Sequence, residues 1–153
     1  MKTATLAAAL ALAFASAATA DPSAPPSPVA QPPAPTGPIG SPPPGQGRVV
    51  FYRPSALYGM VISYTVREND AKLNTLSNGR YFVVDTAPGA HTFTIAVSTT
   101  NRLTVDVTAG RTYYVWAGLE SGIGGEPSLE PAEKSDFDGF YARGKVKLAK
   151  APN

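Results

Sequence analysis

The chain of 153 residues contains a single histidine, His91, and no cysteine. Any nucleophile activated by an imidazole, and any metal site with a histidine ligand, must therefore use His91. This residue follows the turn formed by Pro88 and Gly89, and in the alternating pattern of a strand it shares a face with Phe93 and Ile95. Its position favours a structural residue at the rim of the core over a general base or a metal ligand.

Carboxylates offer a second route to catalysis, because glycoside hydrolysis needs two of them flanking the scissile bond. Nothing in the pattern brings together Glu120 and Glu126, or Glu130 and Glu133. Residues 136–139 resemble a fragment of a calcium loop, but a phenylalanine and a lysine stand where further oxygen ligands are needed. The sequence therefore predicts no catalytic residue, metal or cofactor, and the alternative is a small hydrolase with an unrecognised carboxylate site.

Aromatic side chains are better candidates for contacting a ligand, because they combine a flat apolar face with a polar tip. Most of them are expected to pack in the core. Tyr58 is the exception, since residues 55–59 (SALYG) are typical of a loop, and an exposed loop tyrosine has less core to fill. The candidate ligand contacts are Tyr58, Tyr52, Arg53 and Tyr64.

Short runs of β-branched and aromatic residues, separated by Gly, Pro, Asn and Asp, occupy residues 48–131. In the clearest alternation Phe93 and Ile95 share one face of a strand, while Leu103 and Val105 share a face of the next, and these faces are expected to meet across the core. About seven or eight strands of this kind predict an all-β fold, a small antiparallel β-sandwich. The expected strands are residues 48–53, 61–68, 72–75, 80–85, 90–98, 103–108, 111–119 and 128–130.

The C-terminal segment, residues 132–153, has a different pattern. Ser135 is a suitable N-cap, and Phe137, Phe140 and Tyr141 follow at helical spacing. Two glycines within the same stretch weaken a helix. The pattern leaves open both a short docked helix and a loose tail.

The N-terminal residues predict export. A short basic start is followed by an apolar stretch at residues 4–17 and by the A-x-A site 18–20, so residues 1–20 are expected to be a signal peptide cleaved after Ala20. The alternative, a membrane-spanning helix, needs about 20 apolar residues, which is more than this stretch holds. Residues 21–47 contain 11 of the 16 prolines and predict a disordered, extended linker.

Four short motifs resemble a bacterial family of small exported β-domains of unknown function, often lipid-anchored and akin to PEGA-type domains with a transthyretin-like sandwich. They are residues 50–54 (VFYRP), 78–81 (NGRY), 88–92 (PGAHT) and 109–115 (AGRTYYV). The resemblance covers residues 48–130 and implies a fold and a compartment, because the family has no established activity. This chain departs from the family pattern by lacking the cysteine that a lipid anchor needs.

These patterns together predict a periplasmic or secreted, non-enzymatic binding module of the bacterial cell envelope. The formal net charge of only +2 argues against a nucleic-acid partner, and a protein or an envelope polysaccharide is the expected partner. Removal of the signal peptide leaves no stretch that spans a membrane. A further alternative is a purely structural envelope protein whose partner pairs with an exposed strand edge. The sequence leaves the oligomeric state open.

Overall fold

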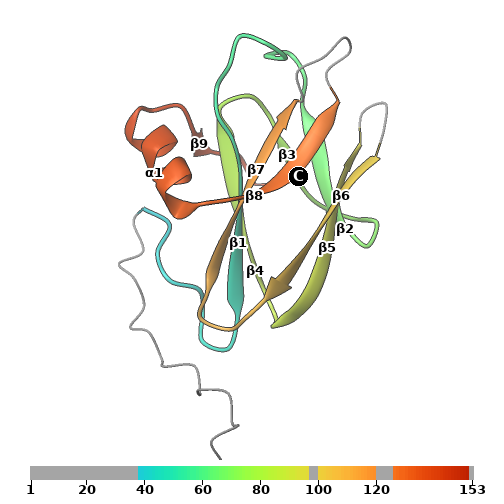
Figure 1. The fold of residues 1–153 in the computed structure, drawn as a ribbon, viewed down its shortest axis with the longest axis vertical. Coiled ribbons are helices and arrows are strands. Elements are labelled where there is room, and N and C mark those ends of the chain that lie inside the picture. The colour runs from blue at the N-terminus through green and yellow to red at the C-terminus, as the bar shows by residue number, and fades with distance from the viewer. Residues whose placement is uncertain (1–37, 97–99, 120–125, 152–153) are drawn as a thin grey trace, which may run out of the picture. The chain divides into compact units, whose positions relative to one another are not determined.

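The computed structural model describes residues 38–96, 100–119 and 126–151. The expected signal peptide, most of the proline-rich linker, Glu120 and the end of the strand expected at 90–98 lie outside these residues. Within the described part the chain forms nine strands and one helix (Figure 1). The elements are β1 (Gly47–Arg53), β2 (Tyr64–Glu68), β3 (Ala71–Leu76), β4 (Arg80–Thr86), β5 (Gly89–Ala96), β6 (Thr100–Val107), β7 (Thr112–Leu119), β8 (Pro127–Ala132), α1 (Lys134–Ala142) and β9 (Lys147–Leu148).

The strands form two sheets that pack as a sandwich, which confirms the predicted fold class. One sheet has five strands in the order β8-β7-β1-β4-β9, and the other has four in the order β3-β2-β5-β6. The four-stranded sheet is antiparallel throughout. The five-stranded sheet is mixed, because β1 pairs in parallel with β7 and β4 pairs in parallel with β9. The prediction of a purely antiparallel sandwich was therefore wrong for this sheet.

The core between the two sheets contains the apolar residues of the alternating pattern. Phe93 and Ile95 of β5 point into it and are almost fully buried, as expected from the parity of the strand. Leu103 and Val105 of β6 pack against the same core. However, β5 and β6 are neighbours in one sheet, with Phe93 opposite Leu103, so the two faces lie side by side rather than across the core. The five-stranded sheet contributes to the same core from β1, β4, β7 and β8.

A second apolar cluster lies on the outer face of the five-stranded sheet. Its centre is Phe137 of α1, which is fully buried against Tyr52, Tyr81 and Tyr114. Helix α1 lies beside β1 and β4, on the side away from β2, β5 and β6 (Figure 1). Strand β1 is thus covered on both faces, which explains its continuous apolar run of Val, Phe and Tyr.

Helix α1 begins two residues earlier than its expected N-cap, Ser135, predicts. Its N-cap is Glu133, whose side chain accepts from the backbone of Asp136 while the Asp136 side chain accepts from the Glu133 backbone. This reciprocal arrangement satisfies two of the free N–H groups at the helix start, so Ser135 falls within the helix instead. A docked helix, and not a loose tail, occupies this part of residues 132–153.

The last residues before β1 contact the sandwich. Ile39 packs against the outer cluster, and the guanidinium of Arg48 donates to the Ile39 carbonyl at 2.6 Å while it pairs with Asp85. The Asp85 carboxylate raises the pKa of Arg48. Among the described residues, no helix has the length and apolar character needed to cross a membrane.

Candidate functional site

Large apolar side chains are exposed on one loop at the end of the sandwich. The β1–β2 loop, residues 54–63, contains no charged residue and is called here the apolar loop. Leu57 and Val61 are 88% and 91% exposed, and Tyr58 and Met60 are more than half exposed. Soluble domains seldom leave several large apolar side chains together in water, so this loop is the first candidate for a contact surface.

The buried side chain of Arg53 hydrogen-bonds to the backbone of the apolar loop. Its two terminal nitrogens donate to the carbonyls of Gly59 and Ile62, each at 2.6 Å, and its guanidinium lies 4.5 Å from the centre of the Tyr64 ring. Burial lowers the pKa of Arg53, and the neighbouring Tyr64 opposes this shift. The arginine therefore uses its planar fork to fix two backbone positions of the loop at once.

A second set of hydrogen bonds fixes the start of the apolar loop. The side-chain amide of Asn78 exchanges two hydrogen bonds of 3.0 Å with the backbone of Ala56. The amide of Ser55 donates to the carbonyl of Lys145 at 2.9 Å, which joins the loop to the segment that follows α1. These bonds tie the loop both to the β3–β4 turn and to the α1–β9 connection.

Gly59 allows the apolar loop to close over the end of β7. Its φ of +66° lies in the left-handed region, and a Cβ there would stand 2.1 Å from Cδ1 of Leu119. Any other residue at position 59 would be strained by the positive φ, and its Cβ would clash with Leu119. The exposed side chains are thus presented by a loop with defined backbone geometry.

A shallow, mostly apolar cleft of about 290 Å³ lies beside the apolar loop. Its lining includes Tyr58 of the loop together with Trp116, Leu119 and Phe140. The indole of Trp116 lies across Gly118, where a Cβ would stand 1.7 Å from the ring. This glycine therefore permits the flat tryptophan face to form part of the cleft.

The four predicted ligand contacts occupy different environments. Tyr58 is exposed on the apolar loop and lines the cleft, and Arg53 lies at the base of both. Tyr64 is fully buried in the core between the sheets. Tyr52 packs under α1 on the opposite face, where burial raises its pKa to about 12. In this arrangement only Tyr58 presents a large surface to a partner.

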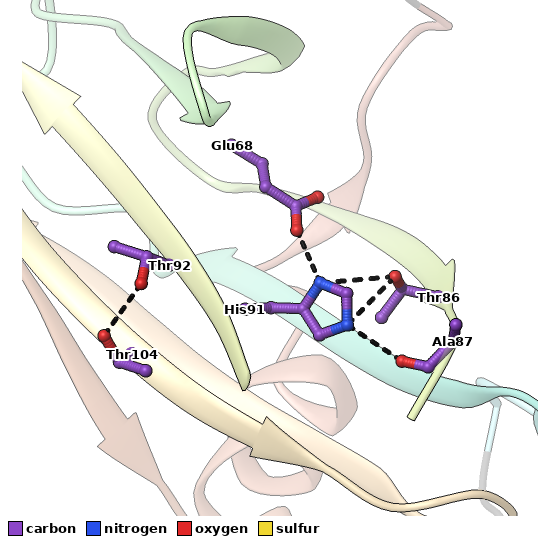
Figure 2. A network of polar contacts seen from close by, with 6 residues as sticks. All are labelled: Glu68, Thr86, Ala87, His91, Thr92 and Thr104. Carbon is purple, nitrogen blue, oxygen red and sulfur yellow. Dashed lines mark hydrogen bonds and ion pairs between the residues drawn. The ribbon is translucent and has the colours of Figure 1, made fainter. Parts of the chain in front are cut away.

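His91 lies at the other end of the sandwich, in a polar network at the rim of the core (Figure 2). Its Nδ1 is 2.5 Å from Oε1 of Glu68, and its Nε2 is 2.8 Å from the carbonyl oxygen of Ala87. Both partners can accept hydrogen bonds, so a protonated ring donates from both nitrogens. The Thr86 hydroxyl lies 3.4 Å from each nitrogen. In this protonated form neither nitrogen has a lone pair to act as a general base.

No cluster of three or more His, Cys, Asp or Glu side chains suited to a metal ion occurs among the described residues. The fragment at 136–139 belongs to α1, where Asp136 caps the helix and Asp138 pairs with Lys134. These carboxylates have structural partners within the helix.

The sequence model of a protein family of unknown function, DUF2846, matches residues 43–127, more than half of the chain. The chain belongs to the DUF2846 family. A search of curated proteins and a search of solved structures each give no significant match. The DUF2846 match contains strands β1 to β7, the apolar loop and His91, and it ends at the first residue of β8. Helix α1, β9 and the basic residues that follow α1 lie beyond it.

Several residues of the candidate site were not predicted from the sequence. Val61 was expected in a strand that in fact begins at Tyr64, and neither Leu57 nor Met60 was predicted as a ligand contact. The available signal was a run of apolar residues, 56–62, that has no alternation and is interrupted by Gly59. The role of Asn78 has no local signal, because its bonds to Ala56 join positions 22 residues apart.

The ion pair of His91 predicts a pH-dependent stability for the DUF2846 domain. The hydrogen bond that His91 donates to Glu68, and secondarily the one to the Ala87 carbonyl, raise the pKa of His91 above 6.5 against the opposing effect of burial. The folded state therefore holds the proton more tightly than the unfolded state. The resulting stabilisation is complete below about pH 6.5 and is lost as the pH rises through the folded-state pKa, by about 1 kcal/mol in all.

Urea unfolding of tag-free protein between about pH 6 and about pH 9 measures this effect. The variant His91→Gln should lose most of the pH dependence, and Glu68→Gln should reduce it because the main cause of the raised pKa is removed. If the free energy of unfolding changes equally with pH in wild type and in His91→Gln, the ion pair does not contribute to the pH dependence of stability.

Proposed function

We propose that this protein is an exported, non-enzymatic binding module of the cell envelope, and that the apolar loop is its docking surface. The proposal rests on residues 54–63, where large apolar side chains are exposed while the backbone is held by hydrogen bonds. Leu57 and Val61 are almost fully exposed, while Arg53 and Asn78 bond to the loop backbone at Gly59, Ile62 and Ala56. A restrained loop loses little conformational entropy when it binds, so little of the free energy gained by burying its apolar surface is offset.

The composition of the apolar loop favours an apolar partner surface over an envelope polysaccharide. Three of its four large exposed side chains are aliphatic, namely Leu57, Met60 and Val61. Recognition of sugars relies on aromatic faces together with polar groups, and here only Tyr58 supplies both. Aliphatic side chains gain most when they leave water for another apolar surface.

Export is supported by the pattern of residues 1–20 and by the proline-rich linker that follows. If residues 21–37 are extended, they reach roughly 50 Å at about 3.1 Å per residue, enough to hold the domain away from a surface. The resemblance to exported β-domains agrees with the same compartment. The non-enzymatic role is supported by His91, whose two ring nitrogens both bond to acceptors.

The chain contains no cysteine, so single-cysteine variants give a clean test of the docking surface. Leu57→Cys places a thiol on the apolar loop, and Ala109→Cys places one on the exposed β6–β7 turn at the opposite end of β7. In purified protein both thiols should react with a maleimide at similar rates. In the native compartment Cys at 57 should react about tenfold more slowly, because its partner covers it, while Cys at 109 should be unaffected.

The comparison between the two environments isolates protection by a partner from protection by the fold. Equal reactivity of the two thiols in the native compartment would exclude the apolar loop as a docking surface. Slow labelling at both positions would mean that the whole domain is enclosed, which also contradicts a site confined to the loop.

A further inference from the structure

We propose that the apolar loop docks on the surface of a membrane that contains anionic lipids. This inference rests on the proposed function and specifies its partner. The exposed aliphatic side chains would enter the boundary between headgroups and acyl chains, as apolar residues of peripheral proteins do. Tyr58, with an apolar ring and a polar hydroxyl, has the character that suits the headgroup level.

Basic residues lie near the start of the apolar loop. The Ser55 amide bonds to the carbonyl of Lys145, and the amide of Lys147 bonds to the carbonyl of Gly79 at 2.9 Å. Strand β9 pairs Lys147 with Arg80, the first residue of β4. The side chains of Arg80, Arg143, Lys145 and Lys147 are all exposed. The backbone thus brings four cationic side chains to the end of the sandwich that carries the loop.

The charge in this region has one sign. Residues 55–63, 77–80 and 143–148 contain these four basic residues and no acidic residue. The described acidic residue Glu126 precedes β8, at the opposite edge of the five-stranded sheet from β9. Four inter-strand steps of about 4.8 Å separate the two edges by roughly 19 Å, about two Debye lengths at physiological salt. The acidic residues of the adjoining helix have partners, since Asp136 caps α1 and Asp138 pairs with Lys134, so an anionic surface would meet mainly the basic cluster.

Two further apolar side chains lie among the basic residues. Tyr141, near the end of α1, is 39% exposed, and Leu148 of β9 is 61% exposed. Together with the four on the apolar loop, they account for all the large exposed apolar side chains found among the described residues. Apolar tips interleaved with lysine and arginine are the composition expected of a surface that meets both headgroups and acyl chains.

Vesicle flotation with the exported protein, its N-terminus established by intact mass, tests the inference. The probes are vesicles of phosphatidylcholine alone and vesicles in which about a third of the lipid is phosphatidylglycerol. Protein should float with the anionic vesicles and much less with the neutral ones, and added salt should weaken binding because the charges are screened. Leu57→Ser with Val61→Ser should weaken binding to anionic vesicles about tenfold.

Two other variants separate the charge from the apolar contact. Lys145→Gln with Lys147→Gln should reduce the preference for anionic over neutral vesicles, and Lys72→Gln, at an exposed position on β3 in the other sheet, serves as the matched control. An environment-sensitive fluorophore attached to Leu57→Cys should shift to the blue on anionic vesicles, whereas the same probe on Ala109→Cys should not. These side chains are exposed, so the variants should unfold like wild type.

The outcomes distinguish this inference from the proposed function. If position 57 is protected in the native compartment but the protein floats with neither type of vesicle, the docking surface stands and its partner is a protein instead of a membrane. If the protein floats equally with both vesicle types, or if the doubly substituted loop floats like wild type, the membrane inference is wrong. If position 57 is not protected in the native compartment, the proposed function itself fails.

Discussion

Phe137→Ala is expected to lower the free energy of unfolding by about 3–5 kcal/mol, which is the usual cost of removing a fully buried phenylalanine. The ring is 0% exposed and packs edge-on against Tyr52 and Tyr81, with centroids 5.4 and 5.3 Å away, and at a tilt against Tyr114. Its removal leaves a cavity between α1 and the five-stranded sheet. It also removes aromatic pairs that stabilise beyond the area they bury.

Chemical denaturation measures this loss, and Tyr141→Ala is the matched control on the same helix. Tyr141 also contacts Phe137 and Tyr81, but it is 39% exposed, so its removal should cost about 1 kcal/mol. A loss of only about 1 kcal/mol for Phe137→Ala, no larger than that for Tyr141→Ala, would show that α1 contributes little to the fold. The DUF2846 match ends before α1, so a large loss would establish the helix as part of this chain's folding unit.

The strands were predictable from the sequence where one face is buried and the other is not. In β5 and β6 the alternation of apolar and polar residues follows directly from the pleat, so burial of Phe93 and Ile95 could be derived from two-residue periodicity. Turns could be predicted from the sequence equally well. Gly79, at the β3–β4 turn, has a φ of +70°, as its position after Asn78 predicts.

Strand pairing and the second core could not be derived in this way. The parallel pairing of β1 with β7 joins Val50 to Tyr114, residues far apart in the chain, and local patterns contain no information about such partners. Tyr52 was predicted as a ligand contact because its aromatic ring combines a flat apolar face with a polar tip. The structure shows that α1 covers the outer face of the five-stranded sheet, which makes Tyr52 a core residue as well.

The apolar loop was only partly predictable for a related reason. The loop character of Tyr58 followed from the Ser and Gly residues near it, whereas the exposure of Val61 depends on where β2 begins. That start is set by Arg53, which bonds to the carbonyl of Ile62 and stacks on Tyr64. A lone arginine at the end of a strand gives no sign in the sequence that it will bind backbone carbonyls six and nine residues later.

Arg53→Met is therefore expected to release the apolar loop and to lower the free energy of unfolding by about 2–3 kcal/mol. The guanidinium is almost fully buried, and its two hydrogen bonds to Gly59 and Ile62 involve a charged donor, a type that is worth more than a neutral bond. Methionine fills part of the same volume but donates nothing, so both carbonyls must turn towards water. Denaturation measures the stability, and amide hydrogen exchange measures the loop.

Exchange should become faster at the amides of Met60 and Ile62, which bond within the loop, and should stay slow in the β5–β6 pair. Arg53→Lys separates charge from shape, because a single ammonium keeps the charge but cannot bridge two carbonyls with a planar fork. If rigidity of the loop matters for docking, Arg53→Met should also abolish the protection of a cysteine at position 57, although it changes none of the exposed side chains. Unchanged exchange at residues 57–62 in Arg53→Met would show that other contacts hold the loop, and full protection of position 57 in that variant would show that docking does not depend on its restraint.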